Sequence, residues 1–434
     1  MIWSKYNFVF PSSQFGLMIY NSLTNSLMTM DPAFEPSIED IMNDPDGFDF
    51  SLYPLALAEM LQNRVLVDPG DEESFMEIMR FEKRAACFDP TTLGLTVLVT
   101  EDCNFGCPYC YEQHKQSCDM SQKVQEQLLQ FISFMGRFRQ INVTWFGGEP
   151  LMRFDTILSL TERLMAMDCD FSAMMVTNGW LLDCHIADQL EQLCIKAIQV
   201  TIEGPPHVHN QKRFHLEHGD SFEKIQSNLD YLMFKSNWTG KLLIHFNIDS
   251  ANAEHYETTR KYWVDRYPGR VVFGINFVDR DQRGSRDMGC CLDREQEIDF
   301  YINEYHTNGG EGLSYFPKRH SGMCSATMRN AFVIGAKGQV YKCWHDVGRK
   351  DREIGSLFEL PQKWNWSLIA QYMTGVDILD DPECCDCFLQ PVCDECPMIR
   401  YRKKYEGQNI SVCARYSDRL AEFLEIHHAR KLKQ

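Results

Sequence analysis

Three closely spaced cysteines follow a strand-like run, 93–100, in the stretch Cys103-Asn-Phe-Gly-Cys107-Pro-Tyr-Cys110. Three thiolates in one loop can each bind one iron of a [4Fe–4S] cluster. Because the four irons of such a cluster ordinarily take four cysteines, one iron stays open to another molecule. Zinc is the alternative metal, since a closed zinc site needs four ligands and His114 lies nearby. The spacing alone leaves both metals open.

A second group of cysteines lies toward the end of the chain. Eight of the eighteen cysteines fall between residues 324 and 413. In a reducing compartment structural disulfides are disfavoured, so clustering of thiols favours metal binding. C-x2-C pairs are also common zinc ligands, which keeps a zinc-ribbon reading open. The eight are Cys324, Cys343, Cys384, Cys385, Cys387, Cys393, Cys396 and Cys413.

Polar residues and glycines end other strand-like runs. Gly147, Gly148 and Glu149 follow the run 141–146. Glycines let a backbone approach a ligand, and a carboxylate at that point can pair with an ammonium group. Taken alone, this segment reads as an ordinary turn.

The elements that must position these residues alternate between strands and helices. Repeated strand–helix units imply a parallel sheet, and six of them favour an α/β fold with an open, partial (β/α)6 barrel rather than a closed barrel of eight. Functional sites then belong at the carboxyl ends of the strands. The expected strands are 93–100, 141–146, 171–177, 197–203, 241–248 and 271–278, and the expected helices lie near 121–135, 155–166, 184–194, 221–235 and 254–264.

The first part of the chain has a different pattern. Residues 5–31 read as short strands with a turn, residues 53–63 as a helix, and the acidic stretch 68–73 as a linker. Strands followed by helices over about eighty residues suggest an independent module of the winged-helix sort.

Composition limits the partners and the compartment. A chain of 434 residues suggests two or three domains. Counting 43 basic against 61 acidic residues gives a net charge of −18, which argues against nucleic acid and against an anionic membrane as partners. We expect a cytoplasmic protein, because no continuous apolar run suggests a secretion signal or a membrane span.

The first cysteine loop resembles that of the radical S-adenosylmethionine superfamily, whose C-x3-C-x2-C motif carries an aromatic residue before its last cysteine, here Tyr109. The resemblance implies that Cys103, Cys107 and Cys110 hold a [4Fe–4S] cluster. It also implies that S-adenosyl-L-methionine chelates the open iron and is cleaved reductively to start radical chemistry.

Later segments match the family in order, and the resemblance assigns cofactor contacts to them. The glycine-rich segment would receive the methionine amino group, and Thr201 and Arg213 would contact the ribose and the carboxylate. Here Thr201 replaces the usual serine and Glu203 the usual aspartate. His245 and Asn247 are weaker candidates. The implied cofactor-binding residues are Tyr109, Gly147, Gly148, Glu149, Thr177, Asn178, Thr201 and Arg213.

The C-terminal cysteines resemble the SPASM extension of peptide-modifying members, although Cys396 comes one residue early for that pattern. The resemblance implies two auxiliary [4Fe–4S] clusters. The fourth ligand of the first cluster stays open, with Cys290 or Cys291 as candidates, and Cys385 could substitute for its neighbour Cys384. The implied ligands are Cys324, Cys343 and Cys396 for the first cluster and Cys384, Cys387, Cys393 and Cys413 for the second.

The first module resembles the leader-peptide recognition domain of enzymes that modify ribosomally made peptides, in which an extended leader adds a strand to a sheet edge. The candidate edge is 26–31, and a mere structural cap is the alternative. We therefore expect a recognition module in 1–85, a partial barrel in 93–290, and a bridge with a SPASM domain in 291–434.

The resemblance as a whole implies an oxidoreductase that matures a precursor peptide by installing a carbon–carbon or thioether crosslink or a related oxidation. Its expected partners are the precursor with its leader and an electron donor such as flavodoxin or ferredoxin. A sulfatase-maturing enzyme that forms formylglycine is one alternative, and a non-catalytic zinc-binding adaptor is another. The catalytic base is not identified.

Overall fold

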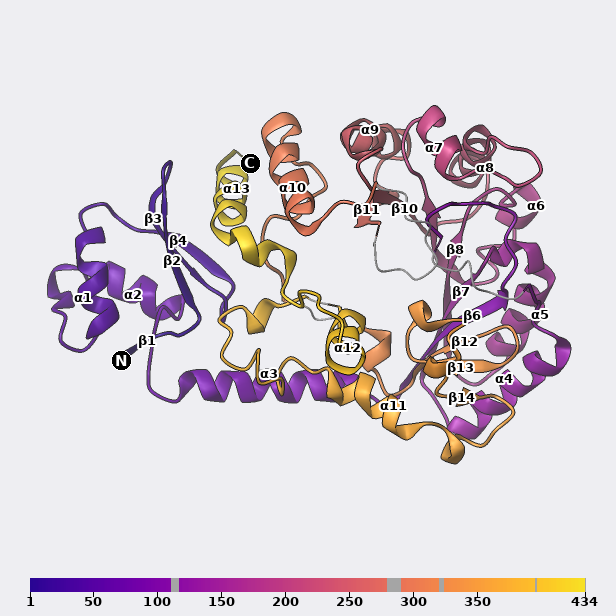
Figure 1. The fold of residues 1–434 in the computed structure, drawn as a ribbon, viewed down its shortest axis with the longest axis horizontal. Helices are drawn as coiled ribbons and strands as arrows, with labels where there is room; N and C mark the ends of the chain where they lie inside the picture. Colours follow the sequence, from indigo (N-terminus) through magenta and orange to yellow (C-terminus); the bar gives the residue numbers. More distant parts are fainter. Residues whose placement is uncertain (111–116, 279–289, 320–323, 395, 434) are drawn as a thin grey trace. The chain divides into compact units, whose positions relative to one another are not determined.

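The computed structural model describes residues 1–110, 117–278, 290–319, 324–394 and 396–433 (Figure 1). His114, the possible zinc ligand, lies outside the described residues. The chain divides into two compact units. The first unit combines Met1–Phe88, Tyr301–Cys324 and Tyr372–Gln434, and the second combines Asp89–Phe300 and Ser325–Gln371. The boundaries expected from the sequence stay a prediction.

The second unit is built on a nine-stranded sheet with the order β11-β10-β9-β8-β7-β6-β12-β13-β14. Strands β6 to β11 pair in parallel with their neighbours, and β12 joins β6 in parallel. The α/β class and all six expected strands are thereby confirmed. The strands are β6 (Thr92–Thr100), β7 (Gln140–Gly147), β8 (Asp170–Thr177), β9 (Ile195–Thr201), β10 (Lys241–Ile248), β11 (Val271–Phe277), β12 (Ala331–Ile334), β13 (Gln339–Tyr341) and β14 (Gly355–Ser356).

Apolar periodicity explains how the helices cover this sheet. In β7, Ile141, Val143 and Trp145 are buried in alternation, as expected for a strand with one face against helices. The side chain of Ser121 accepts a hydrogen bond from the amide of Val124 and so caps the first helix. The helices of this unit are α4 (Gln122–Met135), α5 (Phe154–Met165), α6 (Cys184–Ala187), α7 (Pro206–Lys212), α8 (Phe222–Phe234), α9 (Tyr256–Arg266) and α11 (Trp366–Ala370). Helix α10 (Arg294–Asn308) begins in this unit and ends in the first.

One helix is shorter than its sequence predicts. A helix was expected over 184–194, but α6 ends at Ala187. Cys194 takes a positive φ of 53°, a left-handed conformation that no α-helix continues through. Just beyond it, the pairing of β8 with β9 shifts register between Ala173 and Met174. The chain therefore uses turns here to reach β9.

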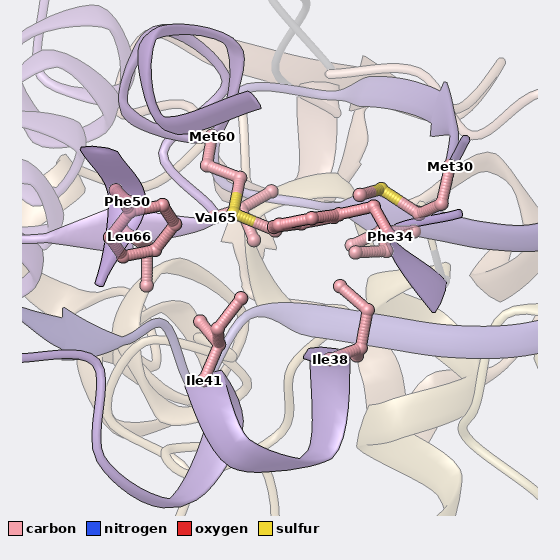
Figure 2. Close-up of a cluster of buried hydrophobic side chains, with 9 residues drawn as sticks. Met30, Phe34, Ile38, Ile41, Phe50, Met60, Val65 and Leu66 are labelled. Carbon is pink, nitrogen blue, oxygen red and sulfur yellow. The ribbon is translucent and has the colours of Figure 1, made fainter. Parts of the chain in front are cut away.

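The first unit contains a three-stranded antiparallel sheet with the order β2-β3-β4, formed by β2 (Asn7–Ser12), β3 (Gly16–Asn21) and β4 (Ser26–Thr29). Its two faces follow the alternation along β3. Ile19 packs into a cluster with Met30, Phe34, Ile38, Ile41, Phe50, Met60, Val65 and Leu66, which Figure 2 shows. Met18 and Tyr20 instead pack with Phe10, Leu389, Val392, Leu420 and Leu424. The sheet is thus buried on both faces.

The first unit also contains a second sheet and several helices. A two-stranded sheet joins β1 (Ile2–Trp3) to β5 (Leu66–Val67), and α1 (Ile38–Asn43) and α2 (Pro54–Gln62) lie between them in the chain. The C-terminal part contributes α12 (Pro397–Glu406) and α13 (Leu420–Lys433). A winged-helix arrangement is not confirmed. Among the described residues, no helix has both the length and the apolar character to cross a membrane.

The acidic stretch 68–73 was expected to be a linker, but Asp71 begins the seventeen-residue helix α3 (Asp71–Cys87). Asp71, Glu72 and Glu73 fill its first turn, where negative charge is favourable at a helix N-terminus. The charge run therefore marks a helix start.

Helix α3 also holds a segment from the other end of the chain. Lys83 Nζ lies 2.5 Å from Asp377 Oδ1, and Arg84 Nη2 lies 2.7 Å from Asp380 Oδ2. Arg80 Nη2 donates to the carbonyl of Leu379 over 3.1 Å. The N-terminal segment and the segment that leads into the C-terminal cysteines are thus parts of one unit.

Candidate active site

The first cysteine group lies in the loop that follows β6. The Cys103 sulfur accepts from the amide of Phe105 over 3.4 Å, and the amide of Cys110 donates to the Cys107 carbonyl over 3.3 Å. The pKa of Cys103 is raised to about 12, mainly by burial and also by the nearby Glu149 and Cys107. Burial also raises the pKa of Cys107, against the opposing charge of Arg213. The structure thus brings two predicted ligands beside two predicted cofactor contacts.

Neighbouring segments clamp the cysteine loop. The amide of Gly106 donates to Phe214 over 3.1 Å, and the amide of Leu216 donates to Asn104 over 2.9 Å. Asn178 Nδ2 donates to Asn104 Oδ1 over 2.7 Å. A Cβ on Gly106 would lie 2.5 Å from the ring of Phe214, so only glycine fits this approach. The loop is therefore held from two sides by backbone contacts and one side-chain bond.

An aromatic group that the sequence analysis missed packs at this clamp. The ring of Trp180 lies 4.5 Å from that of His215 and stacks on that of His218 at 5.7 Å, measured between centroids. Phe105, inside the cysteine loop, lies 5.9 Å from His215. No periodic pattern in the sequence marks these aromatic residues. The one sequence signal that could have found His215 is its position close after Arg213.

Gly147, the last residue of β7, and Gly148 after it have a role that the sequence did not predict. Gly147 has φ 135°, and a Cβ there would lie 2.2 Å from the Thr100 carbonyl oxygen. A Cβ on Gly148 would lie 2.1 Å from the Asp102 carbonyl oxygen. Both glycines therefore admit the backbone that leads into the cysteine loop. Their expected contact with a ligand stays a prediction.

Glu149 is fully buried at the end of β7. Its Oε1 accepts from Thr177 Oγ1 over 2.7 Å and from the amide of Leu151 over 3.0 Å, and its Oε2 accepts from the amide of Asn178 over 2.7 Å. Burial raises its pKa, and these hydrogen bonds oppose the shift. A carboxylate accepts about four hydrogen bonds, so roughly one position is open.

A second buried network joins the cysteine loop to β9 and β10. Tyr109 donates to Glu203, and Arg213 Nη1 donates to Tyr109 Oη over 3.0 Å. Asn247 Nδ2 donates to Glu203 Oε1 over 2.9 Å. Burial raises the pKa of Glu203, and the guanidinium of Arg213 opposes that shift. Of the predicted contacts, Tyr109 and Arg213 therefore meet directly.

The predicted residues Thr201 and His245 lie on strands beside this network, and His209 lies on helix α7. Thr201 is buried at the end of β9 and pairs in register with His245 of β10. His209 Nδ1 accepts from the amide of Glu203 over 3.2 Å, and its Nε2 lies 3.1 Å from Ser221 Oγ. Burial lowers the pKa of His209 well below its ordinary value, so the ring is neutral. We read His209 as a structural residue.

The donor set fits an iron–sulfur cluster with a bound amino acid. Arg213 Nε is buried without a hydrogen-bond partner among the described residues, which suits a carboxylate. Glu149 lies near Cys103 and has acceptor capacity for an ammonium group. Within the described ranges, no three His, Cys, Asp or Glu side chains already form a metal-binding group. Ligation by Cys103, Cys107 and Cys110 together therefore stays a prediction.

The C-terminal cysteines lie on short turns. Burial raises the pKa of Cys384, and the nearby Cys393 and Cys387 raise it as well, so both thiols lie within electrostatic reach of Cys384. The hydrogen bond of Glu383 is the main cause that raises the pKa of Lys403, and Cys413 adds to it. Cys385 is exposed and donates to the carbonyl of its own turn, at Pro382.

The cysteines predicted for the first auxiliary cluster are divided. Cys324 and Cys396 belong to the first unit and Cys343 to the second, so their convergence stays a prediction. Cys290 is a candidate for the fourth ligand. Burial raises the pKa of its thiol, and its hydrogen bond with Asp249 raises this pKa as well.

Comparison with known proteins identifies the region that carries the cysteine loop. Residues 97–237 match the family model of the Radical SAM superfamily. An uncharacterized protein of Methanocaldococcus jannaschii is 30% identical over 112 residues, which are 25% of this chain and 38% of that protein. The radical SAM cyclopropyl synthase TigE of Paramaledivibacter caminithermalis is 23% identical over 198 residues, 38% of this chain and 40% of TigE. These matches span well under half of each relative.

Solved structures extend the likeness to most of the chain. The structure of anSMEcpe with bound AdoMet aligns with a TM-score of 0.62 at 20% identity, covering 79% of this chain and 98% of that one. Streptococcus suis SuiB bound to the precursor peptide SuiA aligns with a TM-score of 0.53 at 14% identity, covering 95% and 99%. At such identities the likeness shows the fold, and it agrees with the expected partial barrel.

Proposed function

Because residues 97–237 form a radical S-adenosylmethionine domain, we propose that this chain is a peptide maturase that takes hydrogen from a ribosomal precursor peptide and installs a crosslink or a related oxidation. Domains of this family use a [4Fe–4S] cluster and S-adenosylmethionine, and together these supply one-electron cleavage of the cofactor and removal of a hydrogen atom from a C–H bond.

The convergence of three groups at the carboxyl ends of β6, β7 and β9 carries this proposal. The cysteine loop, the Glu149 carboxylate and the Arg213 guanidinium act on one another's pKa values, as groups in one site do. Parallel α/β sheets place their ligands at this edge. The edge is therefore the proposed cofactor site.

Each residue has a proposed part in holding the cofactors. Cys103, Cys107 and Cys110 bind the cluster. Glu149 accepts from the ammonium of S-adenosylmethionine, and Arg213 uses its open Nε for the carboxylate. Tyr109 stays fixed beside the cofactor because both Glu203 and Arg213 hold its hydroxyl.

The cofactor's further contacts come from strand ends. Thr177 and Asn178 orient Glu149 by donating hydrogen bonds to it. Gly147 and Gly148 let the backbone that leads into the cysteine loop pass close to β7. Thr201 is positioned at the end of β9 for the ribose. Networks in which every member is hydrogen-bonded hold such groups rigidly before a ligand arrives.

The N-terminal sheet supports the proposal of a peptide substrate. Strand β4 is at the edge of the order β2-β3-β4, and within the described residues it pairs only with β3. Its side chains are half-buried or exposed. SuiB, whose structure contains a precursor peptide, aligns over 95% of this chain. We assign the edge at Ser26–Thr29 to a leader that adds a strand, in preference to a formylglycine-forming role.

Anaerobically purified protein tests the enzyme class. Iron and sulfide with visible absorption, and cleavage of S-adenosylmethionine by dithionite-reduced protein, are expected. Zinc without iron would establish the adaptor instead. With a precursor peptide, mass spectrometry should show loss of hydrogen with all sulfur retained, whereas loss of a thiol sulfur would indicate formylglycine formation from cysteine.

A proline in β4 tests leader binding without removing the module. The amide of Met30 points inward, to Leu17, and strand alternation therefore turns the amide of Thr29 outward. Thr29→Pro removes one outward donor and should weaken leader binding, measured by fluorescence anisotropy, while Thr29→Ala should not. Equal binding by both variants would leave the sheet as a structural cap.

A further inference from the structure

Arg400 lies in the first unit on α12, among the C-terminal cysteines. Its side chain is 4% exposed. Nη2 donates to Cys384 Sγ over 2.9 Å, and Nη1 donates to Asp381 Oδ2 over 3.2 Å. Its Nε is buried without a hydrogen-bond partner among the described residues. A buried guanidinium is thus aimed at the sulfur of a predicted cluster ligand.

The same residue contacts a second predicted ligand through its backbone. The amide of Arg400 donates to the Cys396 carbonyl over 3.2 Å. The turn that carries Cys384 is in turn fixed by Asp381, whose carbonyl accepts from the amides of Cys384 and Cys385, each over 2.9 Å. Asp381 therefore orients both the guanidinium and the cysteine.

We propose that Arg400 is a positioning residue for the auxiliary cluster bound through Cys384, and that its N–H···S hydrogen bond raises the reduction potential of that cluster. This inference rests on the proposed function, since it requires a cluster at Cys384. A cationic donor stabilises the added negative charge of the reduced state, and hydrogen bonds to cluster sulfurs are an established means of setting potentials.

Because Arg400 is buried, we expect its charge to raise the reduction potential more than a charge at the surface would. The guanidinium of Arg400 is shielded from water, so its interaction with sulfur is less screened than that of an exposed lysine. The planar fork lets one side chain hold a carboxylate and a sulfur together, which a lysine ammonium does not do in the same geometry. The chemistry that the site serves is transfer of a single electron to or from the cluster.

The experiment uses full-length protein with Cys103, Cys107 and Cys110 replaced by alanine, so that only auxiliary iron contributes. A redox titration followed by electron paramagnetic resonance measures the midpoint potential. Cys384→Ala in the same background identifies which signal belongs to Cys384. Arg400→Gln should shift the reduction equilibrium at least tenfold toward the oxidised state, which is about 59 mV for one electron, with iron content retained.

Lys404→Gln is the matched control, because it removes one positive charge from the same helix while its Nζ contacts the Gly375 carbonyl, over 2.7 Å, rather than a cysteine. Equal potentials in Arg400→Gln and Lys404→Gln would overturn the proposal. If Arg400→Gln loses iron, Arg400→Lys decides: an intermediate potential supports the proposal, and an unchanged one refutes it. Absence of any auxiliary iron in the parent protein would instead contradict the proposed function.

Discussion

The strand-end site and the C-terminal cysteine region hold their functional residues in different ways. At the strand ends, Glu149 and Glu203 are fully buried and accept hydrogen bonds from residues far away in the sequence. In the C-terminal region, Cys387 and Cys413 are exposed and lie on short turns between few regular elements. The first site is organised by a sheet, whereas the second is organised by local turns and charged contacts.

We therefore expect the order of the two regions to depend on bound metal to different extents. A site whose side chains are fixed by a parallel sheet keeps its geometry when empty, because sheet hydrogen bonds and apolar packing hold it. In the C-terminal region, Leu389 and Val392 pack against the N-terminal sheet, but exposed cysteines such as Cys387 and Cys413 lie on short turns, and we expect metal binding to stabilise these turns. Four experiments test that contrast.

The largest effect should come from removing the three loop cysteines. Replacing Cys103, Cys107 and Cys110 by alanine should abolish cleavage of S-adenosylmethionine, because the cluster that binds the cofactor is lost, while auxiliary iron stays in place. Chromatography of the cleavage product and iron analysis measure the two results. Full cleavage by this variant would refute the assignment of the loop.

Iron removal should separate the two regions directly. After chelation, hydrogen exchange of segment 384–413 should accelerate by roughly tenfold or more, because metal coordination is lost there. Strands β6–β9 should exchange at unchanged rates. Equal acceleration in both regions would show that the sheet site also depends on metal for its order.

Glu149→Gln tests the strand-end network. A charge-assisted hydrogen bond contributes about 1.5–3 kcal/mol, so binding of S-adenosylmethionine should weaken roughly tenfold to a hundredfold, measured by calorimetry. Glu191→Gln is the control, because that carboxylate accepts from Thr239 at the surface. Unchanged affinity in Glu149→Gln would restrict Glu149 to orienting Thr177 and Asn178.

The smallest effect should come from the ion pairs between α3 and the segment 377–380, which leads into the C-terminal cysteines. Lys83→Gln removes a contact with the largely buried Asp377 and should lower the free energy of unfolding of the first unit by about 1 kcal/mol. Lys5→Gln, whose partner Asp386 is exposed and 3.9 Å away, should change it less. Denaturant titration measures both. Equal losses of unfolding free energy would show that the Lys83–Asp377 pair contributes no more to stability than an exposed surface pair.

The ion pairs of α3 with the segment 377–380 make deletion of the N-terminal module a poor test of leader binding. Deleting residues 1–85 would remove Lys83 and Arg84 together with the sheet, and so would disturb the segment at Asp377 and Asp380. A loss of activity after that deletion would not report on leader binding. A point substitution in β4 avoids this problem.

The sequence by itself determined the parts that depend on local pattern. Strand-like runs of residues predicted all six parallel strands, because strand preference is carried by neighbouring residues. The position of Cys103, Cys107 and Cys110 directly after the first run predicted the loop after β6.

Only the tertiary structure decided which distant groups meet. The bonds from Thr177 to Glu149, from Asn178 to Asn104 and from Arg213 to Tyr109 depend on strand order and register, which no local pattern encodes. The acidic start of α3 has the composition of a linker as well as of a helix N-terminus, and packing of the helix resolves that ambiguity. Local pattern thus predicted the six parallel strands, and long-range packing brought the side chains of the site together.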